Sequence, residues 1–209
     1  MTDHNSQYTQ NGTLIVFEGI DGTGKSTQLK LLAEYLSEKG HDVISTREPT
    51  DGIYGQKIRA LYRNRDKTRK EEELSLFLLD RREHVDRVLN PALAAGRTIL
   101  CDRYFLSTIA YQGAAGMDPS YIASQNSFAP TPDLAFIFQL APEVSIERIT
   151  HNRGDVLNDF EEKESLSKAE MIFNSLNFPY IHYINAAQSI AQVHQDVVAV
   201  VESFFRDKR

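Results

Sequence analysis

The segment GIDGTGKS at residues 19–26 carries residue types that bind phosphate groups. It matches the pattern of a glycine, four further residues and then Gly24, Lys25 and Ser26. Glycines let the backbone wrap closely around an anion, and the N–H groups of the loop and of a following helix attract it. The Lys25 ammonium can reach the outer phosphates of a nucleotide, and the Ser26 hydroxyl can bind Mg²⁺. This segment therefore predicts a binding site for nucleotide phosphates and a magnesium ion.

The residues on either side of this loop have the pattern that such a loop requires. An apolar, β-rich run at residues 13–18 precedes it, and a helical pattern at residues 26–39 follows it. Both flanks argue against the alternative, which is a glycine-rich turn without a ligand. GTPases, ATP-driven motors and small-molecule kinases share this loop, so the loop does not identify the reaction.

Asp102 and Arg103 form a second candidate group. Asp102 ends the strand-like run at residues 98–102, and Arg103 follows it. At the carboxyl edge of a parallel strand, a carboxylate directed at Mg²⁺ and a guanidinium directed at phosphate would lie beside the loop. The alternative is a surface ion pair at the end of a strand. The chain has no NKxD segment for reading guanine, which argues against a GTPase.

Two further segments contain groups that could form an acceptor site. TREP at residues 46–49 ends the second strand-like run, and Phe77 and Arg81 lie four residues apart on one face of a predicted helix. An aromatic plane and a guanidinium in this arrangement can together hold a nucleotide base. Taken alone, Phe77 has the alternative of being a core residue.

Four motifs occur in the same order and at similar spacing as in a known family. They are GIDGTGKST, TREP, LFLLDR and DRYFLSTIAYQG. The chain resembles the thymidylate kinases, a family of P-loop nucleoside monophosphate kinases, from about residue 13 to about residue 115 and more loosely to its end. The resemblance implies phosphorylation of dTMP to dTDP with ATP and Mg²⁺, a step in dTTP synthesis for DNA replication.

The resemblance also implies a set of site residues. The nucleotide-binding residues would be Gly19, Ile20, Asp21, Gly22, Thr23, Gly24, Lys25, Ser26 and Thr27. The residues that bind the acceptor would be Glu48, Pro49, Phe77, Arg81, Arg103, Ser107, Thr108, Tyr111 and Gln112. The metal would be held by Ser26 and Asp102.

The resemblance gives the base-binding residues individual roles. Phe77 would stack on thymine, and Arg81 would hydrogen-bond the edge of the base. Thr108 and Gln112 fall at positions that read the base. Tyr111 falls where an aromatic ring lies against the 2′ carbon of the deoxyribose, so it would disfavour a ribonucleotide.

Other positions would surround the reacting phosphates. Glu48 and Pro49 would shape the acceptor pocket. Arg103 would grip the acceptor phosphate, with Asp102 near the metal. Asp21 stands where the family has an acidic loop residue beside the sugar and phosphate of the acceptor.

The reaction that the resemblance implies needs positioning and charge neutralisation more than covalent help. Because the second pKa of a monophosphate is about 6, the acceptor is a competent nucleophile at neutral pH without a strong base. Positive groups should instead absorb the charge of the transition state. The predicted catalytic residues are Lys25, Asp21, Arg103, Arg153 and Arg148.

Two of these arginines are candidates for a small mobile lid at about residues 151–164. Some family members place a basic residue inside the phosphate loop, but this chain has Gly22 at the corresponding position. The missing charge should therefore come from Arg148 or Arg153, with Gly154 as a hinge beside the latter. The alternative is that the charged segment is only a solvated surface loop.

Two segments depart from the family pattern. Residues 50–52 read Thr-Asp-Gly where the family commonly has two glycines and a threonine, so the role of residues 50–55 stays open. Residues 158–161 read Asn-Asp-Phe-Glu where many relatives have Asp-Arg before an aromatic residue and a glutamate. Asp159 therefore replaces an expected arginine, and its effect on the rate stays open.

The elements that position these groups alternate along the chain. Strands are expected at residues 13–18, 43–46, 98–102, 134–140 and 180–185, and helices at 26–39, about 70–95, from about 142, and 190–205. Residues 50–70, with several basic side chains around a short helical pattern, and the charged residues 151–164 are candidates for mobility. The alternation is typical of βαβ units. We expect an α/β P-loop NTPase fold, with a parallel five-stranded sheet, helices on both faces and a small mobile lid.

The chain has 209 residues, of which 41% are hydrophobic, and can bury one substantial core. We expect a disordered polar tail at residues 1–12 and a single kinase domain at residues 13–209. The net charge of −6 gives no general attraction to nucleic acid or to an anionic membrane. Cys101 is the only cysteine, which excludes an intrachain disulfide, and we expect it to be buried in a strand.

The sequence also bears on the cellular location and the partners of the protein. The first twelve residues lack the apolar core of a signal peptide, and no later stretch approaches the roughly 18 apolar residues of a membrane span. We expect a cytoplasmic protein whose partner is the small-molecule substrate dTMP, without nucleic acid or membrane partners. The resemblance suggests a homodimer formed through the apolar faces of the helices near residues 70–95.

Two alternatives to a dTMP kinase stay open. One is a kinase for another deoxynucleoside monophosphate or for a nucleoside, against which the base-reading positions argue. The other is an ATP-binding regulatory protein without turnover, against which the intact phosphate loop argues. Production of ADP that depends on the added acceptor separates all three.

Overall fold

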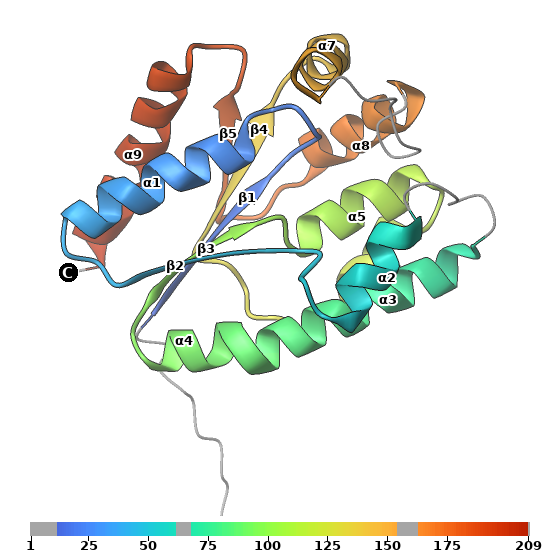
Figure 1. Cartoon of the computed structure of the whole chain (residues 1–209), viewed down its shortest axis with the longest axis horizontal. Helices are drawn as coiled ribbons and strands as arrows, with labels where there is room; N and C mark the ends of the chain where they lie inside the picture. The colour runs from blue at the N-terminus through green and yellow to red at the C-terminus, as the bar shows by residue number, and fades with distance from the viewer. Residues whose placement is uncertain (1–11, 62–67, 154–162, 209) are drawn as a thin grey trace, which may run out of the picture.

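The computed structural model of the chain describes residues 12–61, 68–153 and 163–208. The described residues form a five-stranded sheet in which all neighbouring strands are parallel, in the order β2-β3-β1-β4-β5 (Figure 1). The strands are β1 (Thr13–Glu18), β2 (Val43–Arg47), β3 (Thr98–Asp102), β4 (Leu134–Gln139) and β5 (Ile181–Asn185). The predicted parallel five-stranded sheet is confirmed.

Helices connect the strands. They are α1 (Lys25–Glu38), α2 (Ile53–Leu61), α3 (Lys70–His84), the π-helical turn η2 (Val85–Leu89), α4 (Asn90–Ala94), α5 (Phe105–Ala114), α6 (Pro119–Gln125), α7 (Pro142–Arg153), α8 (Lys163–Ser175) and α9 (Ile190–Asp207). The central strand β1 is buried along its whole length, because a parallel strand covered on both faces is apolar on both sides. Cys101 in β3 is buried, as predicted.

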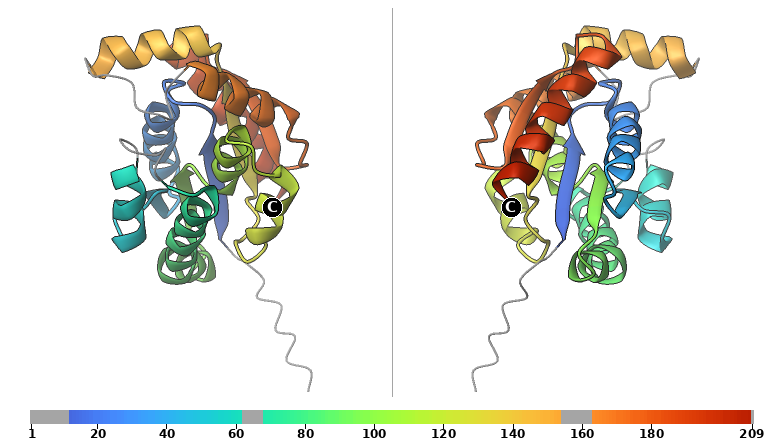
Figure 2. Two further views of the ribbon diagram at one scale, coloured as in Figure 1. Left: turned by 90° about the vertical axis from the view of Figure 1, so that its right-hand side faces the viewer. Right: turned by 90° about the vertical axis from the view of Figure 1, so that its left-hand side faces the viewer.

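The helices cover both faces of the sheet (Figure 2). One apolar cluster joins α1 and α9 to the sheet through side chains such as Leu32 and Val197. The other cluster joins α3, α5 and α8 to the opposite face, through side chains such as Leu74, Ile109 and Phe173. The chain therefore forms the predicted three layers, with the sheet between two layers of helices.

The helical stretch expected at about residues 70–95 is confirmed, and within it the π-helical turn η2 lies between α3 and α4. The N–H of Asn90 bonds to the carbonyl of Val85, five residues earlier. Pro91 follows directly, and a proline lacks the N–H of a regular turn and crowds the preceding turn with its ring. The wider turn accommodates this proline. Turns of this type are frequent at functional sites, and the last residue before it, His84, is buried.

The carboxyl ends of parallel strands meet at one edge of a sheet. In the register of this sheet, Asp102 of β3 pairs with both Phe17 of β1 and Arg47 of β2. The phosphate loop, the end of β2 and the start of α5 are therefore brought together at this edge, although they are far apart in the sequence.

Some sequence predictions fall on residues outside the described ranges. These are residues 1–11 of the expected tail, residues 62–67 of the basic segment and residues 154–162 of the expected lid. Gly12, the described residue of the expected tail, is buried and donates its N–H to the carbonyl of Leu93 at 3.0 Å. None of the helices among the described residues is long and apolar enough to cross a membrane.

Candidate active site

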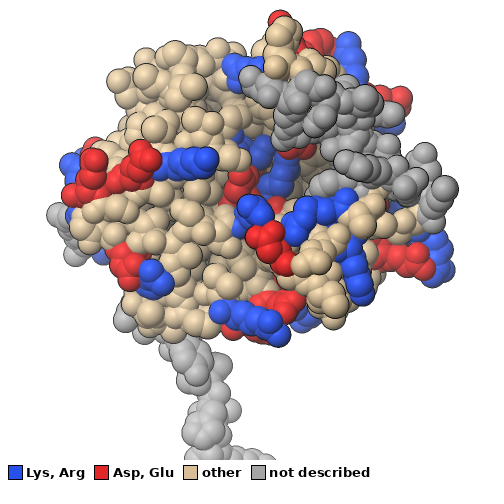
Figure 3. All heavy atoms as spheres, in the orientation of Figure 1, with Lys and Arg blue, Asp and Glu red and all other residues tan. Residues whose placement is uncertain are grey.

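A pocket of about 500 Å³ lies at the carboxyl edge of the sheet. Figure 3 shows acidic and basic side chains together in a hollow on this face of the molecule. Of the predicted site residues, those that line the pocket are Asp21, Gly22, Gly24, Lys25, Ser26, Thr27, Glu48, Pro49, Phe77, Arg81, Asp102, Arg103, Ser107, Thr108, Tyr111, Gln112 and Arg148. The structure thus brings the four motifs, the phosphate loop among them, and α7 to a single cavity of a size typical of small-molecule sites.

The phosphate loop links β1 to α1. Gly22 and Gly24 have φ angles of +77° and +90°, in the left-handed region that glycine adopts without steric cost. The Nζ of Lys25 donates to the carbonyl of Ile20 at 2.7 Å and lies 3.4 Å from the Thr23 hydroxyl. Burial lowers the pKa of this ammonium to about 8. It therefore carries its proton at neutral pH, and its two protein partners are uncharged groups that a phosphate can replace.

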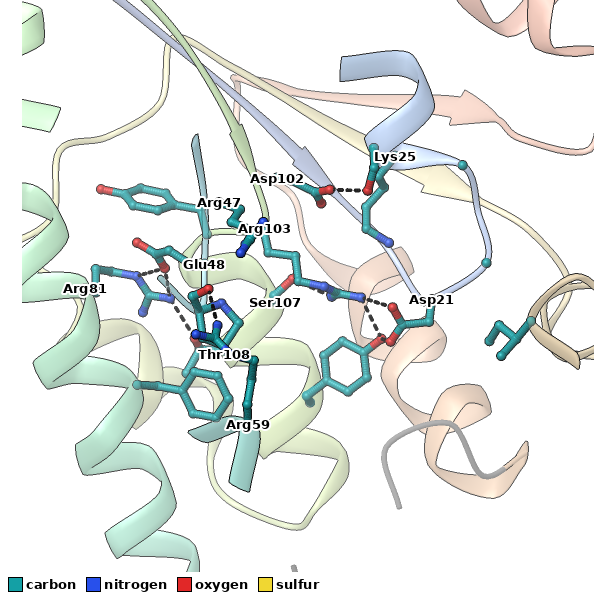
Figure 4. Close-up of a pocket in the computed structure, with 18 of the residues that line it drawn as sticks. Asp21, Lys25, Arg47, Glu48, Arg59, Arg81, Asp102, Arg103, Ser107 and Thr108 are labelled. Atoms are coloured by element: carbon teal, nitrogen blue, oxygen red, sulfur yellow. Dashed lines mark hydrogen bonds and ion pairs between the residues drawn. The ribbon is translucent and has the colours of Figure 1, made fainter. Parts of the chain in front are cut away.

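Ser26 and Asp102 form the candidate metal site. The Ser26 hydroxyl donates to the Asp102 carboxylate, which joins the start of α1 to the end of β3 (Figure 4). Within the described ranges, no group of three or more His, Cys, Asp or Glu side chains is arranged to hold a metal ion. An oxygen pair at a phosphate loop fits Mg²⁺, which keeps several waters and takes its other ligands from substrate phosphates.

Arg103 connects the phosphate loop to α5 (Figure 4). Its guanidinium lies 2.7 Å from the Asp21 carboxylate and 3.1 Å from the Ser107 hydroxyl. The Tyr111 hydroxyl lies 3.3 Å from the other oxygen of Asp21. Arg103 has a φ of +69°, a backbone conformation that residues other than glycine rarely adopt. Residues in such conformations cluster at functional sites. Asp21, Arg103 and Tyr111 therefore stand together between the loop and the acceptor residues.

Glu18 is a buried acid next to this group that the sequence analysis did not assign. Its carboxylate accepts the N–H of Tyr104 at 2.9 Å and the N–H and hydroxyl of Ser107. Burial raises the pKa of Glu18 to about 7, although its bonds to Ser107 lower it. An acid that ends an apolar strand directly before the loop was the available sequence signal. Glu18 fixes the first turn of α5, from which Ser107 reaches Arg103.

Arg81 and Glu48 form the centre of the acceptor side. The Arg81 Nε and one terminal nitrogen lie 2.9 Å and 2.6 Å from a single oxygen of Glu48. Arg81 also donates to the Thr108 hydroxyl at 3.0 Å and to the side-chain oxygen of Asn126. Only 1% of Arg81 is exposed. Sequence reasoning missed Asn126, because nothing in its surroundings indicates a partner 45 residues away.

Phe77 and Gln112 complete the side where the base was predicted to bind. Phe77 is half-buried, lines the pocket and is outside both core clusters, so the alternative of a core residue is not supported. Gln112 is buried and donates its amide to Glu73 at 2.9 Å. Its side-chain oxygen has no hydrogen-bond partner among the described residues. That oxygen is an acceptor that a ligand N–H can satisfy.

Arg47 and Arg59 are two further cations of the pocket that the sequence analysis left without a role. Arg47 lies 2.7 Å from Asp51, and Arg59 lies 3.2 Å from the same carboxylate and donates to the carbonyl of Pro49 at 3.1 Å. Arg47 was visible within TREP, whereas Arg59 was one of several basic residues around a short helical pattern in a segment treated as a candidate for mobility. Both guanidiniums line the pocket while they are paired with the Asp51 carboxylate.

Helix α7 packs against the phosphate loop. The Ser145 hydroxyl donates to the carbonyl of Asp21, and a Cβ on Gly22 would lie 2.6 Å from the carbonyl oxygen of Ser145. This close approach explains why the loop position of Gly22 carries no side chain here. Arg148, one turn further along α7, donates to the carbonyl of Ala186 at 3.2 Å and lines the pocket.

The other lid candidate, Arg153, ends α7. Its side chain, Gly154 and Asp159 lie outside the described residues. The role predicted for Arg153 therefore stays a prediction. Gly19, Ile20 and Thr23 belong to the loop but do not line the pocket within the described part of the chain; Ile20 is a core residue, and its carbonyl is a partner of Lys25.

Comparison with known proteins agrees with this arrangement. The family model for thymidylate kinase matches residues 17–197. A thymidylate kinase of Desulfotalea psychrophila is 57% identical over 195 residues, which cover 93% of this chain and 96% of that protein. A probable thymidylate kinase of Pyrococcus horikoshii is 42% identical and covers 91% of this chain and 96% of its own length. A thymidylate kinase of Brachyspira hyodysenteriae is also 42% identical, with 91% and 94% covered. The chain belongs to the thymidylate kinase family.

Proposed function

We propose that this chain transfers the γ-phosphoryl group of ATP to dTMP, with Mg²⁺ as the metal cofactor. The observation that carries the proposal is one continuous pocket, which has the phosphate loop at one end and Phe77 with Arg81 at the other. Family membership supports a nucleotide phosphate donor and the acceptor dTMP. The Asp21–Arg103 pair lies between the two ends, where the phosphates of donor and acceptor must meet.

The proposed reaction moves one phosphoryl group between two oxygens. A bond forms between a phosphate oxygen of dTMP and the γ-phosphorus of ATP, the bond from that phosphorus to its bridging oxygen breaks, and ADP leaves. The dTMP phosphate is mostly dianionic at neutral pH, so the chain needs no strong base to remove a proton. Its positive groups instead hold the three phosphates in line and balance their charge.

Three side chains have the position for this work. Lys25 would exchange the carbonyl of Ile20 for the β and γ phosphates of the donor. Arg103 would reach the acceptor phosphate from its place beside Asp21. Ser26 and Asp102 would hold the magnesium ion, which supplies charge neutralisation at the donor phosphates.

Recognition of thymine is proposed to use one face and the edge of the base. Phe77 would cover one face, and Arg81 would donate to a carbonyl oxygen of the base, since its guanidinium is already fixed by Glu48 and Thr108. The unpartnered side-chain oxygen of Gln112 would accept an N–H of the base. Thymine offers carbonyl oxygens and one ring N–H, so the donor and acceptor pattern matches.

The test is a steady-state assay of ADP production with dTMP, dUMP, dCMP and dGMP as separate acceptors. A preference for dTMP is expected. A clear preference for a purine acceptor would support the alternative of a kinase for another monophosphate. Tight ATP binding without any acceptor-dependent ADP would support the regulatory alternative.

We also propose that residues 13–209 act as a single domain and that two copies form a homodimer through α3. Helix α3 carries the apolar side chain of Leu79, which is 37% exposed, on the helix where the family resemblance suggests the interface. Sedimentation of the wild type and of Leu79→Glu tests this. A monomeric wild type would contradict the proposal.

A further inference from the structure

Helix α3 buries four polar side chains, three of which lie near its C-terminal end. Asp80, Arg81 and His84 are 1%, 1% and 3% exposed, and each bonds a residue just after the end of β2. Charged and polar residues are rarely buried to this degree without partners. Asp80 accepts the N–H and the hydroxyl of Thr50 at 2.8 Å and 2.6 Å.

Glu48 is held on both of its oxygens by the other two residues. One oxygen receives the Arg81 guanidinium, with the closest nitrogen at 2.6 Å. The other oxygen lies 2.9 Å from the Nδ1 of His84. Because a carboxylate oxygen is an acceptor at this distance, Nδ1 carries a hydrogen and donates.

The other ring nitrogen of His84 has its own partner. Nε2 lies 2.8 Å from the Thr46 hydroxyl, on the strand that leads to Glu48. His84 is therefore bonded at both ring nitrogens, and its orientation is fixed. Arg81 lines the acceptor pocket, whereas His84 is not among the described residues that line it.

From these contacts we infer that His84 is a positioning residue for the acceptor base. It fixes the Glu48 carboxylate from the side opposite Arg81, so that Glu48 holds the Arg81 guanidinium in the direction of the pocket. The inference rests on the proposed function, in which Arg81 contacts the base of dTMP. A change at His84 therefore acts on the acceptor through two intervening side chains, and it leaves the phosphate loop unchanged.

Loss of the Nδ1 donor would leave one oxygen of a buried carboxylate without its hydrogen bond. Glu48 would turn toward another donor, and Arg81 would move with it. Displacement of a binding group by about 1 Å is enough to weaken a binding site strongly. We expect the KM for dTMP to rise about tenfold, with the KM for ATP within about twofold of the wild type.

Two conservative variants separate the two ring nitrogens. The side-chain nitrogen of asparagine reaches about the position of Nδ1, and that of glutamine reaches about the position of Nε2. His84→Asn should retain the bond to Glu48 and keep the KM for dTMP within about threefold of the wild type. His84→Gln and His84→Ala should both show the full rise of about tenfold in the KM for dTMP. Thr46→Val, which removes only the bond to Nε2, should have a smaller effect than His84→Gln.

The controls separate positioning from a general loss of stability. Val197→Ala removes two methyl groups from the core cluster on the other face of the sheet, and it should lower the melting temperature without moving the KM for dTMP. Direct binding of dTMP, measured by calorimetry, covers any His84 variant that folds but turns over slowly.

The possible outcomes are distinct. A KM for dTMP that is equal in His84→Asn and His84→Gln, or one that rises together with the KM for ATP, would overturn the inference about His84. A wild type that produces no ADP with dTMP would instead contradict the proposed function itself, and the inference with it. Binding of dTMP that is selectively weakened in His84→Gln and restored in His84→Asn supports both the inference about His84 and the proposed function.

Discussion

The acceptor side and the donor side of the pocket hold their charges in different ways. On the acceptor side, Arg81, Glu48 and His84 are at most 5% exposed, and each bonds the next. On the donor side, Lys25 bonds a backbone carbonyl and a hydroxyl, and Arg148 bonds the carbonyl of Ala186. A buried charge with ionic partners keeps its orientation, whereas a cation bonded to neutral groups gains by exchanging them for phosphate.

The two substrates are therefore accommodated in different ways. The base of the acceptor meets a site that is already arranged, so binding costs little reordering there. The donor phosphates meet cations whose present partners are replaceable. Asp21 and Arg103 belong to both sides, because their ion pair joins the loop to α5. Variants of the donor side should therefore lower kcat, and variants of the acceptor side should raise the KM for dTMP.

Lys25→Ala tests the donor side most severely. It removes the cation that would balance the charge passing between the β and γ phosphates. We expect kcat to fall about 1,000-fold, because removing one group that stabilises transition-state charge costs about 100-fold to 1,000-fold and Lys25 is only 6% exposed. Lys30→Ala, at an exposed position of α1, is the matched control and should retain wild-type turnover. Near-normal turnover in Lys25→Ala would show that the loop lysine is not catalytic.

The lid arginines should give the next largest effect. Arg153→Ala is expected to lower kcat about 100-fold with little change in the KM for dTMP, because a mobile arginine would act on the transition state only. Arg148→Ala is its comparison, because Arg148 is the other candidate for this charge and lines the pocket. Single-turnover rates with saturating substrates measure both. If only Arg148→Ala lowers the rate, the choice of Arg153 is wrong.

Glu18 tests the junction of the two sides through the pH dependence of stability. Its pKa is about 7 in the folded chain, above the ordinary value of 4.5, so the folded state holds the proton more tightly than the unfolded state. Wild-type stability should therefore be lost as the pH rises from 4.5 through 7. Glu18→Gln has no proton to lose, and its free energy of unfolding relative to the wild type should rise by about 2 kcal/mol between about pH 5.5 and about pH 7.5.

Denaturant unfolding at both pH values measures this difference. Asp133→Asn is the control, because it also removes a carboxylate near the sheet, but one that is 28% exposed. A difference between Glu18→Gln and the wild type that does not change with pH would mean that Glu18 is ionised throughout and that burial does not govern its pKa.

The local parts of the site could be predicted from the sequence. The phosphate loop is eight consecutive residues between a strand and a helix, and its chemistry follows from their types. Phe77 and Arg81 could be placed on one helix face from their spacing alone. Helix α8 was missed although its buried residues Leu166, Ala169 and Phe173 have helical spacing, because the charged segment before it drew the interpretation toward a loop.

The long-range parts could not be predicted in the same way. Sequence reasoning assigned Arg81 to the base, but it gave no sign that Glu48, 33 residues away, would hold the guanidinium. The buried role of His84 depends on the same contact and on Thr46, 38 residues away. Such pairs follow from the packing of α3 against the end of β2, which local pattern and propensity do not fix.

Phe77→Ala is the smallest of these changes and the most direct test of the acceptor side. Stacking of a base on an aromatic ring is worth about 1–3 kcal/mol, so the KM for dTMP should rise about tenfold while the KM for ATP stays within about twofold. Phe77→Tyr keeps the ring and should bind dTMP nearly as well as the wild type, which separates stacking from packing. Phe178→Ala, at a surface position 36% exposed and outside the pocket lining that the described residues form, controls for the loss of an aromatic side chain. Equal effects of Phe77→Ala on both substrates would mean that Phe77 only supports α3. The contrast between an acceptor side with fixed charges and a donor side whose cations exchange their partners would then rest on Arg81 and Glu48 alone.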